Sequence, residues 1–269
     1  MHERAAELIR SNPIYKIVQG LWRRYRFARL SPEDESRLRF YAQFIRPGCL
    51  VFDVGANLGN RSKIFLQLGA NVVAFEPQAS CGVLLSQMFE KNRRFRLVRK
   101  ALGPAEGSAV MFIGDSHTIS SLSKNWIDAT MKSGRFASSR WSGRQEVAVT
   151  TLDVAMSTFG FPSFIKIDVE GFEFEVLKGL SRPIETLSIE VVPEYLENAF
   201  RCLRLLEDLA EFQFQFSFGE SMQFALAEWI SNAEIREWLK ALPPGSFGDL
   251  YARLKRPITD RNGLLVSGN

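Results

Sequence analysis

Cysteines are scarce in this sequence, and none lie close together. Only three occur among 269 residues, at Cys49, Cys81 and Cys202. An odd number of widely spaced cysteines predicts neither a disulfide framework nor the paired spacing of a zinc ribbon. We therefore expect a reducing compartment, and we assign the chain to the cytoplasm.

Long apolar runs are also missing. No segment approaches the roughly 18 uncharged apolar residues of a membrane-spanning helix. The first residues, Met1 to Arg4, do not lead into the apolar stretch of a secretory signal. We predict no transmembrane segment and no signal peptide.

A strong excess of one charge is absent too. The chain carries 34 basic and 30 acidic residues, which gives a net charge of +4 and a sequence pI near 9.0. This excess is too small to indicate nucleic-acid binding, which would need a clustered basic stripe. Hydrophobic residues make up 46% and charged residues 24% of the chain, as in an ordinary globular protein with one sizeable core.

The first 48 residues predict a helical extension. Apolar residues recur at helical spacing between Ala5 and Tyr25, and Ser31-Pro32 followed by three acids predicts a helix start. Residues 22–29 are basic with interleaved aromatics. They fit either an amphipathic helix with a solvated face, or a surface for an anionic substrate, a membrane or a partner chain. Residues 1–48 are also our candidate for oligomerisation.

From residue 49 to residue 269 we predict one α/β domain. Strand and helix patterns alternate from Leu50 onward, which is typical of a doubly wound, mostly parallel sheet. The predicted strands of this sheet are 50–54, 71–75, 96–100, 164–169 and 187–192. Short strands at 109–113 and 146–149 interrupt the alternation and flank a long polar loop, 114–145. Beyond residue 198 we predict a helix, strands at 212–218 and 221–226, and a helix at 228–242.

The first strand of the domain ends in a glycine-containing turn. Asp53, Gly55 and Gly59 follow an apolar run and precede a helical pattern, as where a buried strand turns into a helix that receives a ligand at its amino end. Gly55 can adopt a positive φ, Gly59 allows close helix–strand packing, and Asp53 can accept a hydrogen bond from a ligand's amino group. The alternative is a generic strand–turn–helix.

The glycine spacing argues against a nicotinamide cofactor. The dinucleotide fingerprint requires glycines at its first, third and sixth positions. Here Asn57 and Asn60 occupy the third and sixth positions counted from Gly55. An NAD-dependent oxidoreductase is therefore the weakest of the enzymatic interpretations.

An acidic residue ends the next predicted strand. Glu76 lies 21 positions beyond Gly55 and is followed by Pro77. An acid about 20 residues after such a turn holds the ribose hydroxyls of a bound cofactor in folds of this type. Glu76 therefore predicts a ribose-bearing cofactor, although an acid at a helix start is the alternative.

Three ionisable residues alternate at the end of a later strand. Lys166, Asp168 and Glu170 lie on one side of this segment, and Glu190 ends the following strand. The carboxylates could orient a substrate, act as a general base or bind a divalent cation. An ion pair between Lys166 and a carboxylate is the purely structural alternative. In the long loop, His117 is a second candidate base, and Ser120 and Ser121 offer hydroxyls to a ligand.

Together these segments resemble the FkbM family of S-adenosylmethionine-dependent methyltransferases over about residues 49–255. The resemblance rests on Phe52-Asp53-Val54-Gly55-Ala56-Asn57, Ala74-Phe75-Glu76-Pro77, Ala101-Leu102-Gly103, Ser120-Ser121-Leu122, Thr151-Leu152-Asp153, Ile167-Asp168-Val169-Glu170-Gly171, Glu190 and Gly248-Asp249. It implies a class I (Rossmann-like) fold with a seven-stranded sheet. It also implies methyl transfer from S-adenosylmethionine, usually to a hydroxyl oxygen of a saccharide or another small molecule such as a secondary metabolite.

The resemblance also implies roles for individual residues. The cofactor would contact Asp53, Gly55, Asn57, Gly59, Glu76, Pro77, Ala101 and Leu102. The catalytic candidates are Asp168, Glu170, Lys166 and His117. By analogy with small-molecule O-methyltransferases of this fold, Asp168 and Glu190 could instead hold Mg²⁺.

Two other functions remain open from the sequence. A nucleic-acid methyltransferase would fit the mild positive charge, but the only Pro-Pro pair, Pro243-Pro244, lacks the context found in amino-methylating DNA enzymes. A non-catalytic interaction protein could retain the fold, although intact acids at Asp53, Glu76, Asp168 and Glu170 argue against it.

Overall fold

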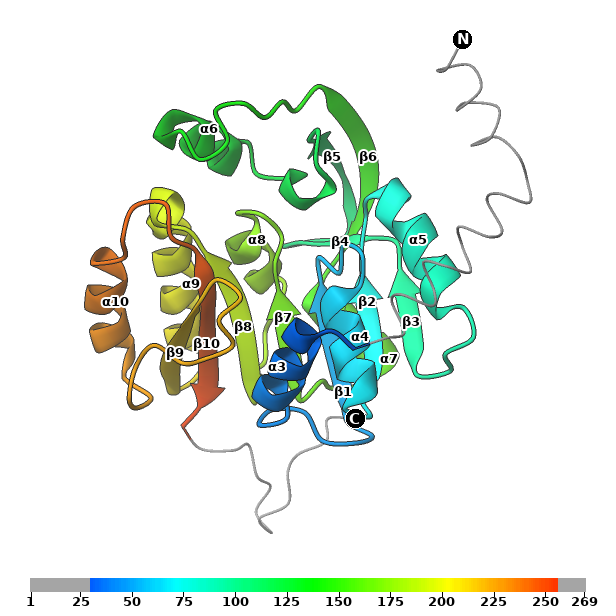
Figure 1. Cartoon of the computed structure of the whole chain (residues 1–269), viewed down its shortest axis with the longest axis horizontal. Coiled ribbons are helices and arrows are strands. Elements are labelled where there is room, and N and C mark those ends of the chain that lie inside the picture. Colours follow the sequence, from blue (N-terminus) through cyan, green and yellow to red (C-terminus); the bar gives the residue numbers. More distant parts are fainter. Residues whose placement is uncertain (1–29, 256–269) are drawn as a thin grey trace.

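The computed structural model describes residues 30–255 (Figure 1). The helices predicted before residue 30 and the basic stretch 22–29 lie outside this range. Within it, no helix has the length and apolar character needed to cross a membrane. Cys49, Cys81 and Cys202 are free thiols.

A seven-stranded sheet runs through the molecule in the order β3-β2-β1-β7-β8-β10-β9 (Figure 1). Its strands are β1 (Leu50–Val54), β2 (Asn71–Phe75), β3 (Phe95–Val98), β7 (Phe164–Ile167), β8 (Thr186–Val191), β9 (Phe212–Phe218) and β10 (Gly248–Leu254). All neighbours pair in parallel except β10, which is antiparallel to both β8 and β9. The predicted doubly wound, mostly parallel sheet is confirmed.

Helices cover both faces of this sheet. One face packs against α3 (Pro32–Tyr41), α4 (Asn60–Gln67) and α5 (Ala79–Phe89). The other packs against α7 (Leu152–Phe159), α8 (Glu173–Leu177), α9 (Leu196–Leu209) and α10 (Asn232–Lys240). Because side chains alternate along a strand, Val51 of β1 joins the first core, whereas Phe52 and Val54 join the second.

Residues 101–150, which we call the cap, lie above the carboxyl ends of the parallel strands (Figure 1). A small sheet in the order β4-β6-β5 forms its base, from β4 (Ala101–Leu102), β5 (Gly107–Ile113) and β6 (Gly143–Thr150). Between β5 and β6 lie a 3-10 turn, η1 (His117–Ile119), and helix α6 (Lys124–Ser133).

The prediction of a long polar loop at 114–145 is wrong, because α6 forms there. Ser123 caps its first turn by accepting the N–H of Trp126, and Gly134 ends it in the left-handed region. Trp126 is only 1% exposed and packs against the rings of Phe136 and Trp141. A small aromatic core of its own therefore stabilises this part of the cap.

The predicted strand at 221–226 is also wrong, since this segment is irregular, with bends but no strand. The side chain of Gln215 substitutes for a strand ladder there. Its amide donates to the carbonyls of Leu226 and Glu228, and its oxygen accepts the N–H of Leu226. The following helix is shorter than predicted and begins only at Asn232.

The carboxyl ends of β1 and β7 approach each other at Gly55. This residue has a φ of +80°, and a Cβ built on it would lie 1.8 Å from the carbonyl oxygen of Asp168. Only glycine fits there without moving one of the two strand ends. The turn after β1 and the turn after β7 are therefore held together through their backbones.

Replacing Gly55 with alanine should be far more costly than the same change in open space. Gly134 is the matched control, because its φ is +89° and a Cβ would meet nothing within 4 Å. We expect Gly134→Ala to lower the free energy of unfolding by about 1 kcal/mol, from backbone strain alone. Gly55→Ala should lower it by about 2–4 kcal/mol through strain plus overpacking. Equal losses in chemical denaturation would contradict this close approach.

Candidate functional site

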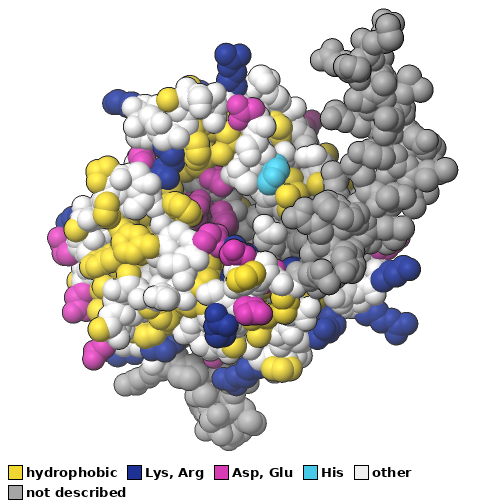
Figure 2. All heavy atoms as spheres, viewed as in Figure 1, with side chains coloured by type: hydrophobic (Ala, Val, Ile, Leu, Met, Phe, Trp, Pro, Cys, Tyr) yellow, Lys and Arg dark blue, Asp and Glu magenta, His cyan; other side chains and the backbone are white. Residues whose placement is uncertain are grey.

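A cavity opens at the carboxyl ends of β1, β2 and β7, and the cap forms its roof. Acidic side chains gather in the hollow at the centre of the face seen in Figure 2. Most residues singled out from the sequence line this cavity: Asp53, Gly55, Asn57, Glu76, Pro77, Ala101, Leu102, His117, Lys166, Asp168 and Glu170. Gly59 lies behind its wall, and Glu190 borders a smaller adjoining void.

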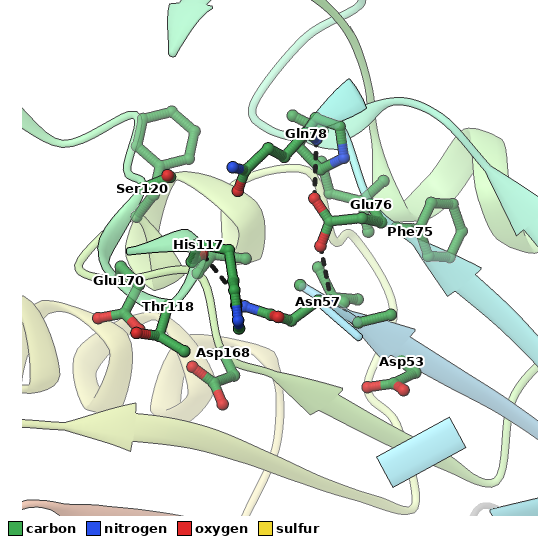
Figure 3. A pocket seen from close by; sticks show the side chains of 18 of the residues that line it. Asp53, Asn57, Phe75, Glu76, Gln78, His117, Thr118, Ser120, Asp168 and Glu170 are labelled. Atoms are coloured by element: carbon green, nitrogen blue, oxygen red, sulfur yellow. Dashed lines mark hydrogen bonds between the residues drawn. The ribbon is translucent and has the colours of Figure 1, made fainter. Parts of the chain in front are cut away.

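Glu76 is held rigidly at the end of β2. Its Oε2 accepts the N–H of Asn57 at 2.7 Å, and its Oε1 accepts the N–H of Gln78 at 2.7 Å (Figure 3). Burial raises the pKa of this carboxyl to about 7. Each oxygen keeps a further lone pair, so both can still accept a ligand hydroxyl. This geometry suits a pair of adjacent ribose hydroxyls.

The glycine turn is shaped by its neighbours rather than by glycine alone. Asn57 itself adopts a positive φ of 51°, and its side-chain amide donates to the carbonyl of His117 at 3.2 Å. A Cβ on Gly59 would lie 2.7 Å from the side chains of Leu85 and Phe89 on α5. Gly59 was expected to allow close packing of a helix on a strand. It instead allows helix α4 to start close to helix α5.

Asp53 lies at the inner end of the cavity and is only 2% exposed. The hydroxyl of Ser62, in the first turn of α4, donates to its Oδ2 at 2.6 Å. Burial raises the pKa of this carboxyl, while the hydrogen bond from Ser62 and the nearby Lys166 oppose the shift. Asp53 thus anchors the start of α4 and presents a carboxylate beside it.

Lys166 is a buried cation between two acids. Its Nζ lies 2.8 Å from Asp168 Oδ2 and 3.6 Å from Asp249 Oδ1, and the side chain is 2% exposed. Burial alone would lower its pKa, but Asp168 and Asp249 outweigh burial and raise it. A lysine that stays protonated cannot act as a base. Its contribution is to hold the Asp168 carboxylate in place.

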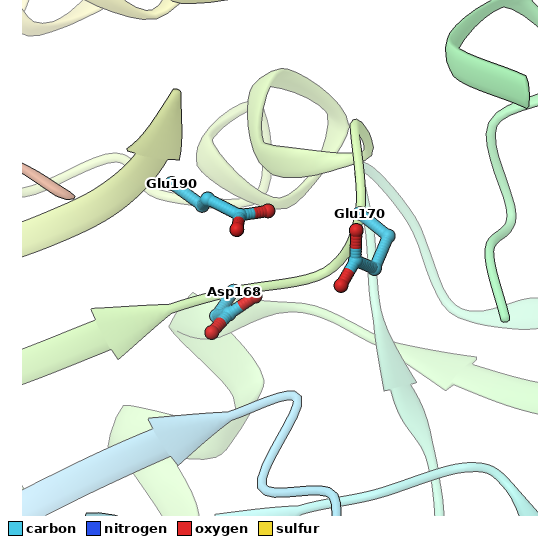
Figure 4. Close-up of side chains that lie close together, drawn as sticks. All are labelled: Asp168, Glu170 and Glu190. Atoms are coloured by element: carbon cyan, nitrogen blue, oxygen red, sulfur yellow. The ribbon is translucent and has the colours of Figure 1, made fainter. Parts of the chain in front are cut away.

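Three carboxylates converge at the rim of the cavity. Asp168 and Glu170 follow β7, Glu190 belongs to β8, and oxygens of all three lie within 4.8 Å of one another (Figure 4). Burial raises the pKa of Glu170, and Glu190 and Asp168 raise it further. Burial likewise raises the pKa of Glu190, with Asp168 adding to the shift. The group can accept a proton, bind a hydroxyl-bearing substrate or hold a hard cation.

The turn that carries these acids is tied down by a residue that the sequence reasoning missed. Glu173 Oε1 accepts the N–H groups of Val169 and Gly171, and its Oε2 accepts the Asn198 side chain at 2.7 Å. Burial raises the pKa of Glu173 to about 7. Glu170 itself adopts a positive φ of 54°, which these hydrogen bonds help to maintain. An acid two positions after Gly171 was the available signal.

The candidate residues between β5 and α6 differ in whether they hold the fold together or face the cavity. Ser121 is 1% exposed, and its hydroxyl donates to the carbonyl of Glu170 at 2.6 Å. The hydroxyl of Ser120 accepts the N–H of Gly114. The side chain of His117 is exposed at the edge of the cavity, as Figure 3 shows. Ser121 is thus structural, while Ser120 and His117 can both reach a ligand.

Arg61 and Glu220 also line the cavity, although the sequence reasoning did not single them out. Arg61 Nη2 donates to Glu220 Oε1 at 2.6 Å across a separation of 159 positions. No spacing rule links residues so far apart in the chain. The structure therefore adds a basic group to a cavity that the sequence predicted to be lined by acids.

Comparison with known proteins gives one family and several similar folds. A family model described as the methyltransferase FkbM domain matches residues 53–243. Precorrin-6y C5,15-methyltransferase from Geobacter metallireducens GS-15 has 11% identity and a TM-score of 0.44, over 82% of this chain and 87% of that one. An O-methyltransferase from Bacillus cereus, solved in complex with SAH, has 13% identity and a TM-score of 0.42, over 84% of this chain and 83% of that one. No curated protein matches the sequence significantly.

The family match starts at Asp53 and extends past α10, so it contains the glycine turn, Glu76, the cap and the converging acids. The observed strand order and the polar carboxyl ends are those expected of a class I methyltransferase. Since the match spans more than half of its 269 residues, the chain belongs to the methyltransferase FkbM domain family.

Proposed function

We propose that the protein is an S-adenosylmethionine-dependent O-methyltransferase that acts on a hydroxyl of a saccharide or secondary metabolite. The observation that carries this proposal is the convergence of Asp168, Glu170 and Glu190 at the rim of the cavity that also contains the Glu76 carboxylate. A site of this kind offers acceptors to hydroxyl groups and a base for the proton that must leave.

The residues present fit the cofactor. Glu76 keeps free lone pairs for both ribose hydroxyls, and the glycine turn lets the backbone approach a ligand. Pro77, Ala101 and Leu102 provide apolar surface beside Glu76 for the adenine ring. Asn57 and Asp53 continue the same wall toward β7. When bound, S-adenosylmethionine supplies an activated methyl group, so the protein mainly has to align the acceptor and remove its proton.

Glu170 is the better placed of the two candidate bases. The Oδ2 of Asp168 already accepts a hydrogen bond from the ammonium of Lys166, so this oxygen is engaged within the protein. Glu170 has no ion pair of this kind among the described residues, and burial together with Glu190 and Asp168 raises its pKa, which makes its carboxylate a stronger base. Asp168 would then orient the acceptor hydroxyl, and His117 at the edge of the cavity is the secondary candidate base.

A divalent cation is the alternative role for these acids. Carboxylate oxygens are suitable ligands for Mg²⁺, and Asp168 and Glu190, with Glu170 as a third group, have the required proximity. A bound cation would lower the pKa of an acceptor hydroxyl. The neighbouring Lys166 already neutralises part of the negative charge, which favours the metal-free mechanism.

Glu76→Gln should weaken cofactor binding. The change removes the charge and one acceptor oxygen, and a hydrogen bond to a charged group is worth about 1.5–3 kcal/mol, so we expect a loss of about 10- to 100-fold in affinity. Calorimetric titration with S-adenosylhomocysteine measures this. Glu146→Gln, on the exposed face of β6, is the control. Unchanged affinity in Glu76→Gln would refute the ribose assignment.

Glu170→Gln should lower turnover and leave affinity for S-adenosylhomocysteine near normal. A general base contributes about 10²- to 10⁴-fold to rate, so labelled-methyl transfer to saccharide and metabolite extracts should fall by that order. Asp168→Asn should also lower transfer, because it weakens the bond to Lys166. Full activity in Glu170→Gln would assign the base elsewhere.

Treatment with EDTA distinguishes a general base from a metal ligand as the role of the converging acids. For the metal-free mechanism we expect no change in methyl transfer after dialysis against EDTA. A loss of activity that Mg²⁺ restores would instead assign Asp168 and Glu190 to a cation. The same assay with Glu190→Gln checks the result, since a ligand mutant should raise the Mg²⁺ concentration needed for half-maximal rate.

A further inference from the structure

Arg61 has hydrogen-bonding capacity that the chain leaves unused. It lies in the first turn of α4, lines the cavity and is 12% exposed. Only its Nη2 donates to a carboxylate, that of Glu220. Its Nε is buried and has no hydrogen-bond partner in residues 30–255. A buried guanidinium donor without an acceptor is costly and is therefore a sign of a ligand.

Arg61 belongs to a network of charged side chains. Glu220 is shared, because Arg37 Nη2 also contacts its Oε2 at 3.0 Å. Arg37 additionally contacts Asp34, which pairs with Lys63 at 2.6 Å. These five groups comprise three cations and two carboxylates, and the buried acids Asp53 and Asp249 also interact electrostatically with Arg61. The pKa of Glu220 is lowered to about 2, where burial would raise it, because the two arginines outweigh burial.

The amino end of α4 offers further hydrogen-bond donors to a ligand. Gly59 caps the helix without a side-chain hydrogen bond, and the described chain places no acid in its first turn. The first N–H groups of a helix have no partner within it and favour negative charge. Beside them lies Asp53, which Ser62 holds in place. A carboxylate and a guanidinium at one end of a cavity match the two charges of an α-amino acid.

The order of the strands indicates where the amino-acid part of the proposed cofactor would lie. Glu76 ends β2, β1 is next, and β7 follows. A cofactor whose ribose is held at Glu76 and whose adenine lies toward Ala101 and Leu102 must extend its amino-acid part the other way, toward β1 and β7. Arg61 and Asp53 line that side of the cavity.

We infer that Arg61 binds the α-carboxylate of the cofactor's amino-acid part, with Glu220 and Arg37 holding the guanidinium in position. This inference rests on the proposed cofactor. It makes helix α3, and the loop after β9 that is far from the glycine turn in sequence, supports of the cofactor site. Arg61 Nε and the first N–H groups of α4 supply the donors.

The test compares two ligands on the full-length chain. S-adenosylhomocysteine carries the α-carboxylate, and its decarboxylated analogue lacks only that group. We expect the wild-type protein to bind the first about 10- to 100-fold more tightly, as for a charged hydrogen-bonded contact. Arg61→Gln should lose this preference by weakening S-adenosylhomocysteine while leaving the analogue unchanged. Arg61→Lys should retain part of it. Arg39→Gln, on the exposed face of α3 where Arg39 pairs with Glu35, is the control and should keep it.

The outcomes are distinct. Equal losses for both ligands in Arg61→Gln, or equal affinity of the wild-type protein for both, would overturn the inference. The wild-type comparison needs no variant, so it decides the question even where Arg61→Gln fails to fold. No binding of S-adenosylhomocysteine or its analogue to the wild-type protein would instead refute the proposed cofactor.

Discussion

The site depends on one buried cation. Lys166 reaches from β7 to Asp168, which follows the same strand, and to Asp249 near the amino end of β10, so the charges of two acids from different parts of the sheet are compensated inside the protein. An uncompensated buried charge costs several kcal/mol. Without Lys166, the Asp168 carboxylate would lose its ion pair at the point where three acids meet. Lys166 also lowers the pKa values of Glu170 and Glu190, but burial and the neighbouring acids outweigh it and raise them.

Two buried acids lower the stability of the fold as the pH approaches neutrality. Glu76 and Glu173 have pKa values of about 7 in the fold, compared with 4.5 in an unfolded chain. A raised pKa contributes stability that is complete below pH 4.5 and is lost as pH rises through 7. A ligand that donates hydrogen bonds to ionised Glu76 opposes this loss. For the proposed cofactor, we therefore expect binding and folding to be linked most strongly near neutral pH.

The sequence predicted correctly which acids would meet, where these acids lie at the carboxyl ends of parallel strands. Asp53, Glu76 and Asp168 each follow an apolar run, and parallel topology brings such ends to one edge of the sheet, so their meeting was predictable. The pairing of Arg61 with Glu220 was not, because a charged residue has many potential partners until the chain path is known. Helix α6 was missed for another reason. Its capping residues, Ser123 and Gly134, are visible in the sequence, but its polar composition resembles that of a loop.

In the proposed function, recognition of the acceptor falls to the cap. The strand ends of the sheet carry the residues proposed for the cofactor and the converging acids, and the cap is fastened to both halves of that sheet. Asn57 donates to the carbonyl of His117 on one side. On the other, Arg135 contacts Glu194 at 3.0 Å and the carbonyl of Ser246. These contacts hold α6 and η1 over the converging acids, so an acceptor that reaches Glu170 must pass the cap. Differences in acceptor between relatives with the same sheet residues would therefore be expected to arise in residues 114–142.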